Sequence, residues 1–254
     1  IGKVFARGRT DQVPIELLTT FIPKLAEDIV ELLCKLLLYG KSIEIDQEIL
    51  KYSSVPGMIS FAAGNPSPEA FPVKEIEQIS ARILGADPIN ALQYSVTEGY
   101  TPLRDTMKKY MSEKHDSFDQ AQDELIITSG AQQVMDLMTK ALVNEGDEII
   151  CEAPSFIGSL NTFRSYGAKL LGVPMDEDGM NMEALEETLR THDKIRFIYT
   201  IPTFQNPSGI TMSLQKRKRL YELAKQYKVL ILEDNPYGEL RYRGETLPTI
   251  KSMD

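Results

Sequence analysis

The chain has 254 residues, of which 42% are hydrophobic and 26% are charged, and its net charge is −9. This balance is typical of a globular protein, and an acidic surface argues against nucleic-acid binding, which needs clustered Lys and Arg. No apolar stretch of about 18 or more residues is present, so no membrane span is predicted. The two cysteines lie far apart without a CxxC pattern, which favours neither a disulfide framework nor a metal site.

The first 50 residues differ in pattern from the rest of the chain. Between Pro23 and Tyr39, leucines and isoleucines recur mostly three or four residues apart, and Gly40 follows. This spacing predicts an amphipathic helix that ends at a glycine cap. We interpret it as a packing helix, with a partner-binding or dimer-arm helix as the alternative. The sequence thus predicts a helical segment at residues 1–50 and one larger domain at residues 51–254.

From about Met58 onward the pattern becomes regular. A Pro-, Gly- and Asn-rich segment, 61–72, predicts a shaped loop. After it, helices are predicted at 73–84, 101–113, 131–144, 156–166, 181–190 and 214–227, and short apolar strands at 124–128, 148–151, 169–173, 196–201 and 229–232. Strands that alternate with longer helices predict an α/β fold with three layers, in which a mostly parallel sheet carries helices on both faces.

Polar, Gly-rich or Pro-rich clusters follow four of the predicted strands. These clusters are 129–132, 152–156, 202–209 and 234–237. Ligands of open parallel sheets bind outside the carboxyl ends of the strands. The sequence therefore predicts one composite active site built from these four segments.

The segment Ser129-Gly130-Ala131-Gln132 stands between a predicted strand and a predicted helix. Its small residues allow a ligand to approach the backbone, and a helix N-terminus offers unpaired N–H groups and partial positive charge, which suit a phosphate. The segment lacks the GxxxxGK[ST] pattern of a Walker loop. A tight strand-to-helix turn without a ligand is the alternative interpretation.

Three further side chains suit a flat, charged heteroaromatic ligand. A carboxylate such as Asp234 at the end of a central strand is costly to bury unless it is paired, and a protonated pyridine nitrogen would pair it. Asn206 sits in a turn shaped by Pro207 and Gly209, where its amide could donate in a fixed direction. Phe156 could stack on the ring. The alternative interpretations are an ordinary acidic loop for Asp234, a plain turn for Asn206 and a core aromatic residue for Phe156.

Six motifs in order resemble the class I and II aminotransferases, which have the fold type I of pyridoxal-phosphate (PLP) enzymes. The motifs are FAAGNPSP at 61–68, LQYSVTEG at 92–99, TSGAQQ at 128–133, EAPSF at 152–156, NPSG at 206–209 and EDNPY at 233–237. The resemblance covers about residues 48–254, and it is greatest to the 2-aminoadipate, kynurenine and multi-substrate branch. It implies the large, PLP-binding domain of that fold.

The resemblance implies a role for each matching residue. The residues that hold the cofactor phosphate would be Ser129, Gly130, Ala131 and Gln132. Phe156 would stack on the pyridine ring, and Asp234 would bind the ring nitrogen. Asn206 and Tyr237 would hydrogen-bond the phenolic oxygen, so that Asp234, Tyr237 and Asn206 are the expected catalytic residues.

Two residues nearer the N-terminus also receive roles from the resemblance. Gly64 lies in the loop that contacts substrate, and Tyr94 matches a tyrosine that reaches the phosphate of the neighbouring subunit. The resemblance therefore implies a homodimer.

The family's Schiff-base lysine follows the aspartate region, in a Ser- and Lys-rich loop. Here only Lys251 follows Asp234, and its surroundings resemble the linker before that loop. The carboxylate-binding arginine belongs to a C-terminal small domain that also has no counterpart. We therefore expect this chain to be an inactive fragment of a longer protein, since the lysine also transfers the proton.

The expected function of the complete protein is PLP-dependent transfer of an amino group between an amino acid and a 2-oxo acid. Two alternatives remain open. The first is the PLP-binding effector domain of a transcription regulator, although residues 1–50 show no clear recognition helix or basic patch. The second is another PLP reaction on the same fold, such as elimination or decarboxylation. No secretory signal is evident, and a cytoplasmic location is expected.

Overall fold

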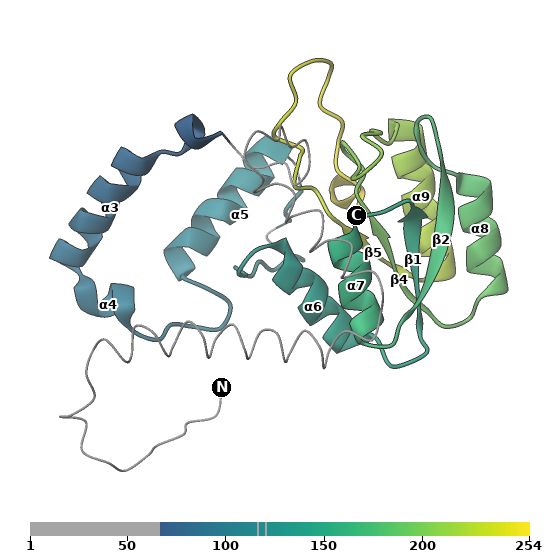
Figure 1. The fold of residues 1–254 in the computed structure, drawn as a ribbon, viewed down its shortest axis with the longest axis horizontal. Coiled ribbons are helices and arrows are strands. Elements are labelled where there is room, and N and C mark those ends of the chain that lie inside the picture. The colour runs from purple at the N-terminus through teal and green to yellow at the C-terminus, as the bar shows by residue number, and fades with distance from the viewer. Residues whose placement is uncertain (1–66, 116, 120) are drawn as a thin grey trace, which may run out of the picture. The chain divides into compact units, whose positions relative to one another are not determined.

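A computed structural model describes residues 67–115, 117–119 and 121–254 (Figure 1). The helix predicted between Pro23 and Tyr39 lies outside the described residues, and so does Gly64. The boundary predicted between a helical segment and a larger domain at residue 50 also lies there, and it stays a prediction.

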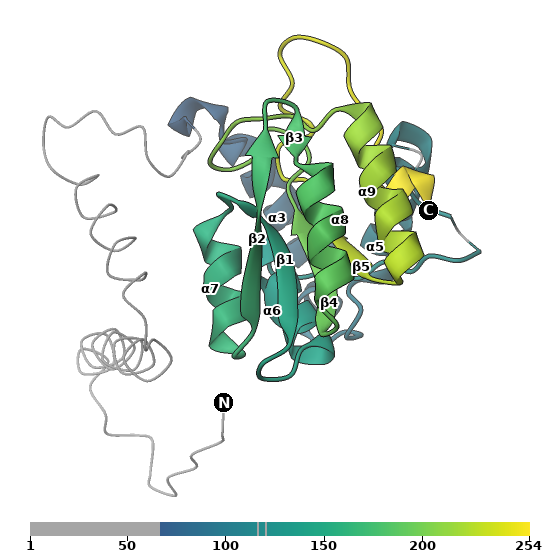
Figure 2. The ribbon, with the colours of Figure 1, turned by 90° about the vertical axis from the view of Figure 1, so that its right-hand side faces the viewer.

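One five-stranded sheet forms the centre of the described structure. Its strands are β1 (Glu148–Ala153), β2 (Lys169–Asp176), β3 (Gly179–Met180), β4 (Ile195–Thr200) and β5 (Leu230–Glu233). Their order across the sheet is β3-β2-β1-β4-β5, and every pair is parallel except β2 with β3. The predicted, mostly parallel sheet is thus confirmed, and it can be followed in Figure 2.

Helices cover both faces of this sheet, as the sequence predicted. On one face lie α6 (Ala131–Leu142) and α7 (Ile157–Ser165), and on the other lie α8 (Met182–Thr191) and α9 (Leu214–Tyr227) (Figures 1 and 2). Two of the helices begin at side-chain caps: the Asn181 side chain accepts from the N–H of Ala184, and the Ser213 hydroxyl accepts from the N–H of Lys216.

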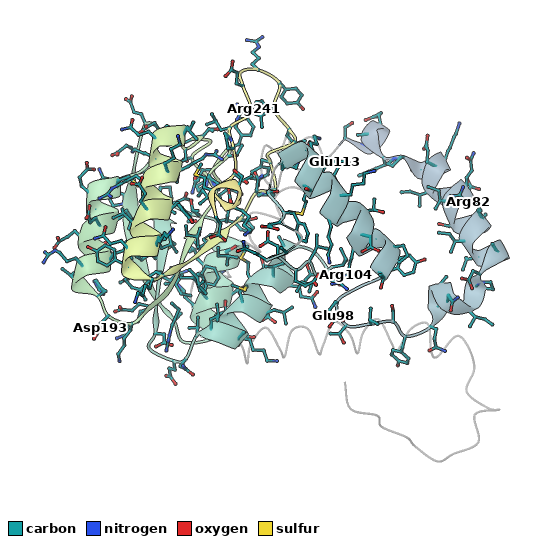
Figure 3. The ribbon with its side chains drawn as sticks, turned by 180° about the vertical axis from the view of Figure 1, so that it is seen from behind. Arg82, Glu98, Arg104, Glu113, Asp193 and Arg241 are labelled. Atoms are coloured by element: carbon teal, nitrogen blue, oxygen red, sulfur yellow. The ribbon has the colours of Figure 1, made fainter. Side chains whose placement is uncertain are left out.

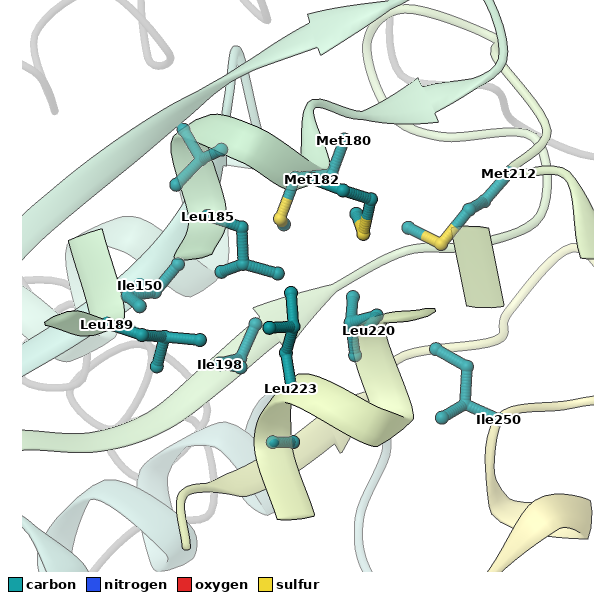
Figure 4. Packing of buried hydrophobic residues seen from close by; sticks show 12 residues of the cluster. Ile150, Met180, Met182, Leu185, Leu189, Ile198, Met212, Leu220, Leu223 and Ile250 are labelled. Atoms are coloured by element: carbon teal, nitrogen blue, oxygen red, sulfur yellow. The ribbon is translucent and has the colours of Figure 1, made fainter. Parts of the chain in front are cut away.

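Two hydrophobic cores result, because neighbouring residues of a strand point to opposite faces. Ile150 and Ile198 face α8 and α9, where they pack with Leu185 and Leu220 (Figure 4). The residues beside them in sequence pack on the other face, against α6 and α7; they are Ile149, Cys151, Phe197 and Tyr199. Burial on both faces explains why these strands read as continuous apolar runs.

The strand predicted at 124–128 is wrong. The structure assigns no strand there, because the backbone pairs with other groups: the N–H of Ile127 donates to the carbonyl of Glu98, and Arg104 Nε donates to the carbonyl of Leu125. Gly99 has a φ of +104°, and a Cβ on it would lie 2.7 Å from the Cβ of Ile127. Only glycine suits both that backbone conformation and that approach.

Three further helices precede α6 in the described part of the chain. They are α3 (Val73–Ala86), α4 (Pro88–Leu92) and α5 (Thr101–His115), and two short 3-10 turns occupy Pro68–Ala70 and Lys251–Met253. All residues from 67 to 98 are exposed. None of the helices in the described part of the chain has the length and apolar character needed to cross a membrane.

Replacing Leu220 by alanine should lower the free energy of unfolding by about 2–5 kcal/mol, because the side chain is fully buried between α9 and the sheet. Leu240→Ala, at a leucine that is 56% exposed, is the matched control and should change stability by less than about 0.5 kcal/mol. Urea denaturation followed by circular dichroism measures both, and equal losses would contradict the described core.

Candidate active site

The carboxyl ends of β1, β4 and β5 form one edge of the sheet. The three strands are adjacent and parallel, and Cys151, Tyr199 and Leu232 lie opposite one another in register. The segments that leave this edge are 154–156, 201–209 and 234–237. Three of the four predicted clusters therefore meet at one place, because parallel strands end at the same side of a sheet.

Asp234 is the first residue after β5, and its side chain is half-buried. The Tyr199 hydroxyl donates to Asp234 Oδ2 at 2.9 Å, and the Ser159 hydroxyl donates in turn to the Tyr199 oxygen at 3.0 Å. Burial raises the pKa of Asp234, and the hydrogen bond from Tyr199 opposes that rise. The Asp234 carboxylate is therefore held in one orientation by Tyr199 of β4, which Ser159 of α7 holds in turn.

Asp234 forms no ion pair with any residue that the structure describes. The Tyr199 hydroxyl donates to only one of the two carboxylate oxygens of Asp234. A partly buried carboxylate is stabilised by a cationic donor. A protonated ring nitrogen is such a donor, so the residues present fit the group that the sequence implies.

Asn206 and Tyr237 come from the segments after β4 and β5 and meet directly. Asn206 Nδ2 donates to the Tyr237 hydroxyl at 3.2 Å, and both side chains are half-buried. A tyrosine hydroxyl and an amide are both donors, and together they suit one anionic oxygen. The pair that the sequence predicted is therefore brought together.

Phe156 stands directly before α7, as its N-cap residue, and its ring is half-buried beside the core. A Cβ on Gly158 would lie 2.7 Å from this ring, so any larger residue at position 158 would clash with the ring where it now lies. The aromatic side chain thus lies at the same edge of the sheet as Asn206 and Asp234, as predicted from its position after a strand.

The N-terminus of α6 is exposed from Ser129 to Gln133, and Gly130 caps it with a φ of +79°. The N–H of Ser129 donates to Gln133 Oε1 at 2.6 Å, and no side chain caps the first turn. The Gln132 amide donates to the Gly158 carbonyl and to the Thr162 hydroxyl, which ties α6 to α7. A phosphate would therefore meet the backbone N–H groups here, and the Gln132 side chain serves the packing of the two helices.

One described residue of the predicted site, Tyr94, is not brought to this edge. Tyr94 is 98% exposed, and its backbone N–H donates to its neighbour Gln93. Gly64 lies outside the described residues. Lys251, interpreted from the sequence as an exposed linker residue, is partly exposed, and its Nζ lies 2.9 Å from both Asp123 and Asp254.

Residues that sequence reasoning missed support the site from behind. Tyr199 and Ser159 hold Asp234, while Gln205, in the segment after β4, donates to Glu152 in β1 and to the carbonyl of Pro154 in the segment after it. The sequence signal for this support was Tyr199, a tyrosine inside the apolar strand β4. A buried tyrosine hydroxyl needs a hydrogen-bond partner, so its position indicates a polar group nearby. Ser159 carries no signal in sequence. Within the described ranges, no group of three or more His, Cys, Asp or Glu residues could hold a metal ion.

The fold and this edge define an α/β protein with a composite ligand site at the carboxyl ends of parallel strands. Comparison with known proteins then identifies the family. Residues 56–252 match the family model of aminotransferase class I and II. The chain is 44% identical over 218 residues to aromatic-amino-acid aminotransferase 1 of Thermococcus litoralis, in a match that covers 84% of this chain and 52% of that protein.

Solved structures agree with this match. The kynurenine aminotransferase of Pyrococcus horikoshii, in complex with PMP, aligns with a TM-score of 0.80 and 38% identity over 91% of this chain and 57% of that one. The alpha-aminoadipate aminotransferase of Thermus thermophilus, complexed with N-(5'-phosphopyridoxyl)-L-leucine, aligns with a TM-score of 0.73 and 38% identity over 85% of this chain and 51% of that one.

This chain belongs to the class I and II aminotransferase family, as its motifs predicted. It has the α/β fold of the fold type I members. It spans about half the length of the relatives that it matches.

Tyr199→Phe should raise the pKa of Asp234 further, because the carboxylate loses the donor that opposes the effect of burial. Tyr166→Phe is the matched control: its hydroxyl donates to Asp136 at a more exposed position. Carbon-13 NMR titration of the aspartate carboxyls measures the shift. An unchanged Asp234 titration in Tyr199→Phe would show that the hydrogen bond does not act on the carboxylate.

Proposed function

We propose that the complete protein is a PLP-dependent aminotransferase that moves an amino group between an amino acid and a 2-oxo acid, and that the described residues form its cofactor-holding part. The observation that carries the proposal is Asp234, a half-buried carboxylate without a cationic partner among the described residues. The family match and the pyridoxyl compound in a structural neighbour support it.

Each segment of the edge would hold one part of the cofactor. Asp234 would accept from the ring nitrogen and keep it protonated, because a negative charge stabilises the pyridinium. Asn206 and Tyr237 would donate to the phenolic oxygen, Phe156 would cover one face of the ring, and the N-terminus of α6 would bind the phosphate. When bound, PLP supplies the electron sink that amino-group transfer requires.

A lysine supplied by chain beyond Asp254 would complete the catalytic residues. Lys251 is engaged by Asp123 and Asp254, which leaves it poorly suited to that role. The residues shown here would then bind and orient the cofactor, and the lysine would move the proton. The 254-residue chain alone is therefore proposed to be inactive.

Tyr94 is almost fully exposed, which supports the role of reaching the phosphate site of a second copy, and hence a homodimer. We also propose a cytoplasmic location and a place in amino-acid metabolism, both of which rest on the resemblance of the sequence to its family.

The chain should bind PLP reversibly, and Asp234→Asn should weaken binding by roughly tenfold or more, because a charge-assisted hydrogen bond becomes a neutral one. The control is Asp193→Asn, at an exposed aspartate between α8 and β4 (Figure 3). Absorbance titration with PLP measures both. Equal affinity of the two variants would contradict the role of Asp234.

The unextended chain should show little or no transamination, and borohydride reduction should leave no PLP attached after denaturation. A version of the protein continued beyond Asp254 should gain both activity and a lysine adduct. Mass spectrometry locates the adduct. Turnover by the 254-residue chain comparable to that of the longer version would refute the proposal that the lysine lies downstream.

A further inference from the structure

Glu152, near the end of β1, is a buried carboxylate that the proposed cofactor contacts do not use. Its exposed fraction is 2%, and it forms no ion pair with the described residues. It accepts hydrogen bonds from the Thr200 hydroxyl at 2.6 Å, from the N–H of Ile201 at 3.3 Å and from Gln205 Nε2 at 2.9 Å. Burial raises the pKa of Glu152, and these donors oppose the rise. Such a costly group is maintained only where its hydrogen bonds are satisfied.

Gln205 is the residue that connects Glu152 with the edge of the sheet. Its exposed fraction is also 2%. Besides Glu152, Nε2 donates to the carbonyl of Pro154 at 2.8 Å, and Oε1 accepts from the N–H and the hydroxyl of Ser208 at 2.9 and 2.6 Å. All four hydrogen-bonding positions of the amide are used, so the side chain has one satisfied orientation.

These contacts cross from one strand end to the next. β1 and β4 are parallel neighbours, so the segments that follow them leave the sheet side by side. Pro154 is two residues before Phe156, and Gln205 is the covalent neighbour of Asn206. The amide of Gln205 therefore ties the backbone that carries the Phe156 ring to the turn that carries the Asn206 amide.

Building on the proposed function, we infer that Glu152 and Gln205 are positioning residues that set the separation between the Phe156 ring and the Asn206 amide. They thereby set the orientation in which a phosphate-bearing pyridine ring is held. Neither residue needs to touch the cofactor, since both act through their neighbours.

Gln205→Met tests this inference, because methionine keeps the length of the side chain and removes all four hydrogen bonds. The variant should bind PLP roughly tenfold more weakly. The circular dichroism of the bound PLP, normalised to the amount bound, should change in sign or intensity, because this signal reports how the ring is oriented in its site.

Two further variants separate positioning from general stability. Ser213→Ala removes the cap of α9 and should lower the melting temperature without altering the PLP signal. Glu152→Gln keeps the size of the side chain but replaces one carboxylate oxygen with an amide donor, so the side chain can no longer accept from Thr200 and from Gln205 through separate oxygens. The PLP signal should therefore change as it does in Gln205→Met, and this comparison stands even if Gln205→Met fails to fold.

The outcomes distinguish this inference from the proposed function. An unmodified chain that binds no PLP overturns the proposed function, and the inference with it. If the unmodified chain binds PLP but Gln205→Met shows the same affinity and the same normalised signal, the inference alone is overturned. A Glu152→Gln variant with unchanged affinity and unchanged normalised signal also overturns it. Weaker binding and an altered signal in both Gln205→Met and Glu152→Gln, with neither change in Ser213→Ala, support it.

Discussion

The parallel pairing of β1, β4 and β5 is the constraint on which the candidate site depends. Three neighbouring strands run in one direction, so the segments that carry Phe156, Asn206 and Asp234 leave the sheet at one edge. The register matters as much as the direction. A shift of one residue would turn Tyr199 to the other face of the sheet and separate its hydroxyl from Asp234.

Buried polar side chains hold the segments at this edge by hydrogen bonds. Arg217 in α9 is 1% exposed and donates to the carbonyls of Met212, Pro202 and Pro248, which holds the loop after β4 and the segment near the end of the chain. The Arg217 guanidinium holds this loop by hydrogen bonds to its backbone, as the Gln205 amide holds the turn at Asn206. Each of these buried donors is satisfied, and a fully satisfied network has a single arrangement.

The segment that carries Tyr237 is held from another side by α5. Glu239 accepts from Lys114 at 2.6 Å and from the Tyr110 hydroxyl at 2.9 Å. Lys114 and Tyr110 lower the pKa of Glu239 to about 2, so the carboxylate stays charged at neutral pH. These contacts are exposed to solvent and therefore contribute little to stability, but they join a helix before the sheet to the edge of the site.

The alternation of apolar strands with amphipathic helices, read from the sequence alone, determined the α/β fold, because strand and helix periods are local properties. The bounds of α9 were also predictable, since Ser213 is a local cap and the pattern ends at Tyr227. The residues around Asp234, Asn206 and Phe156 could be selected because each follows a strand. Their grouping into one site followed from the parallel sheet.

Only the tertiary structure decided which groups pair. The partners of Asp234 and Glu152 lie 35 and 53 residues away in the sequence, and a hydrogen bond at such separation leaves no periodic pattern. The segment 124–128 has the apolar residues of a strand, yet its backbone groups pair with Glu98 and Arg104. Strand formation requires a neighbouring strand as well as a suitable sequence, and that partner is a property of the folded chain.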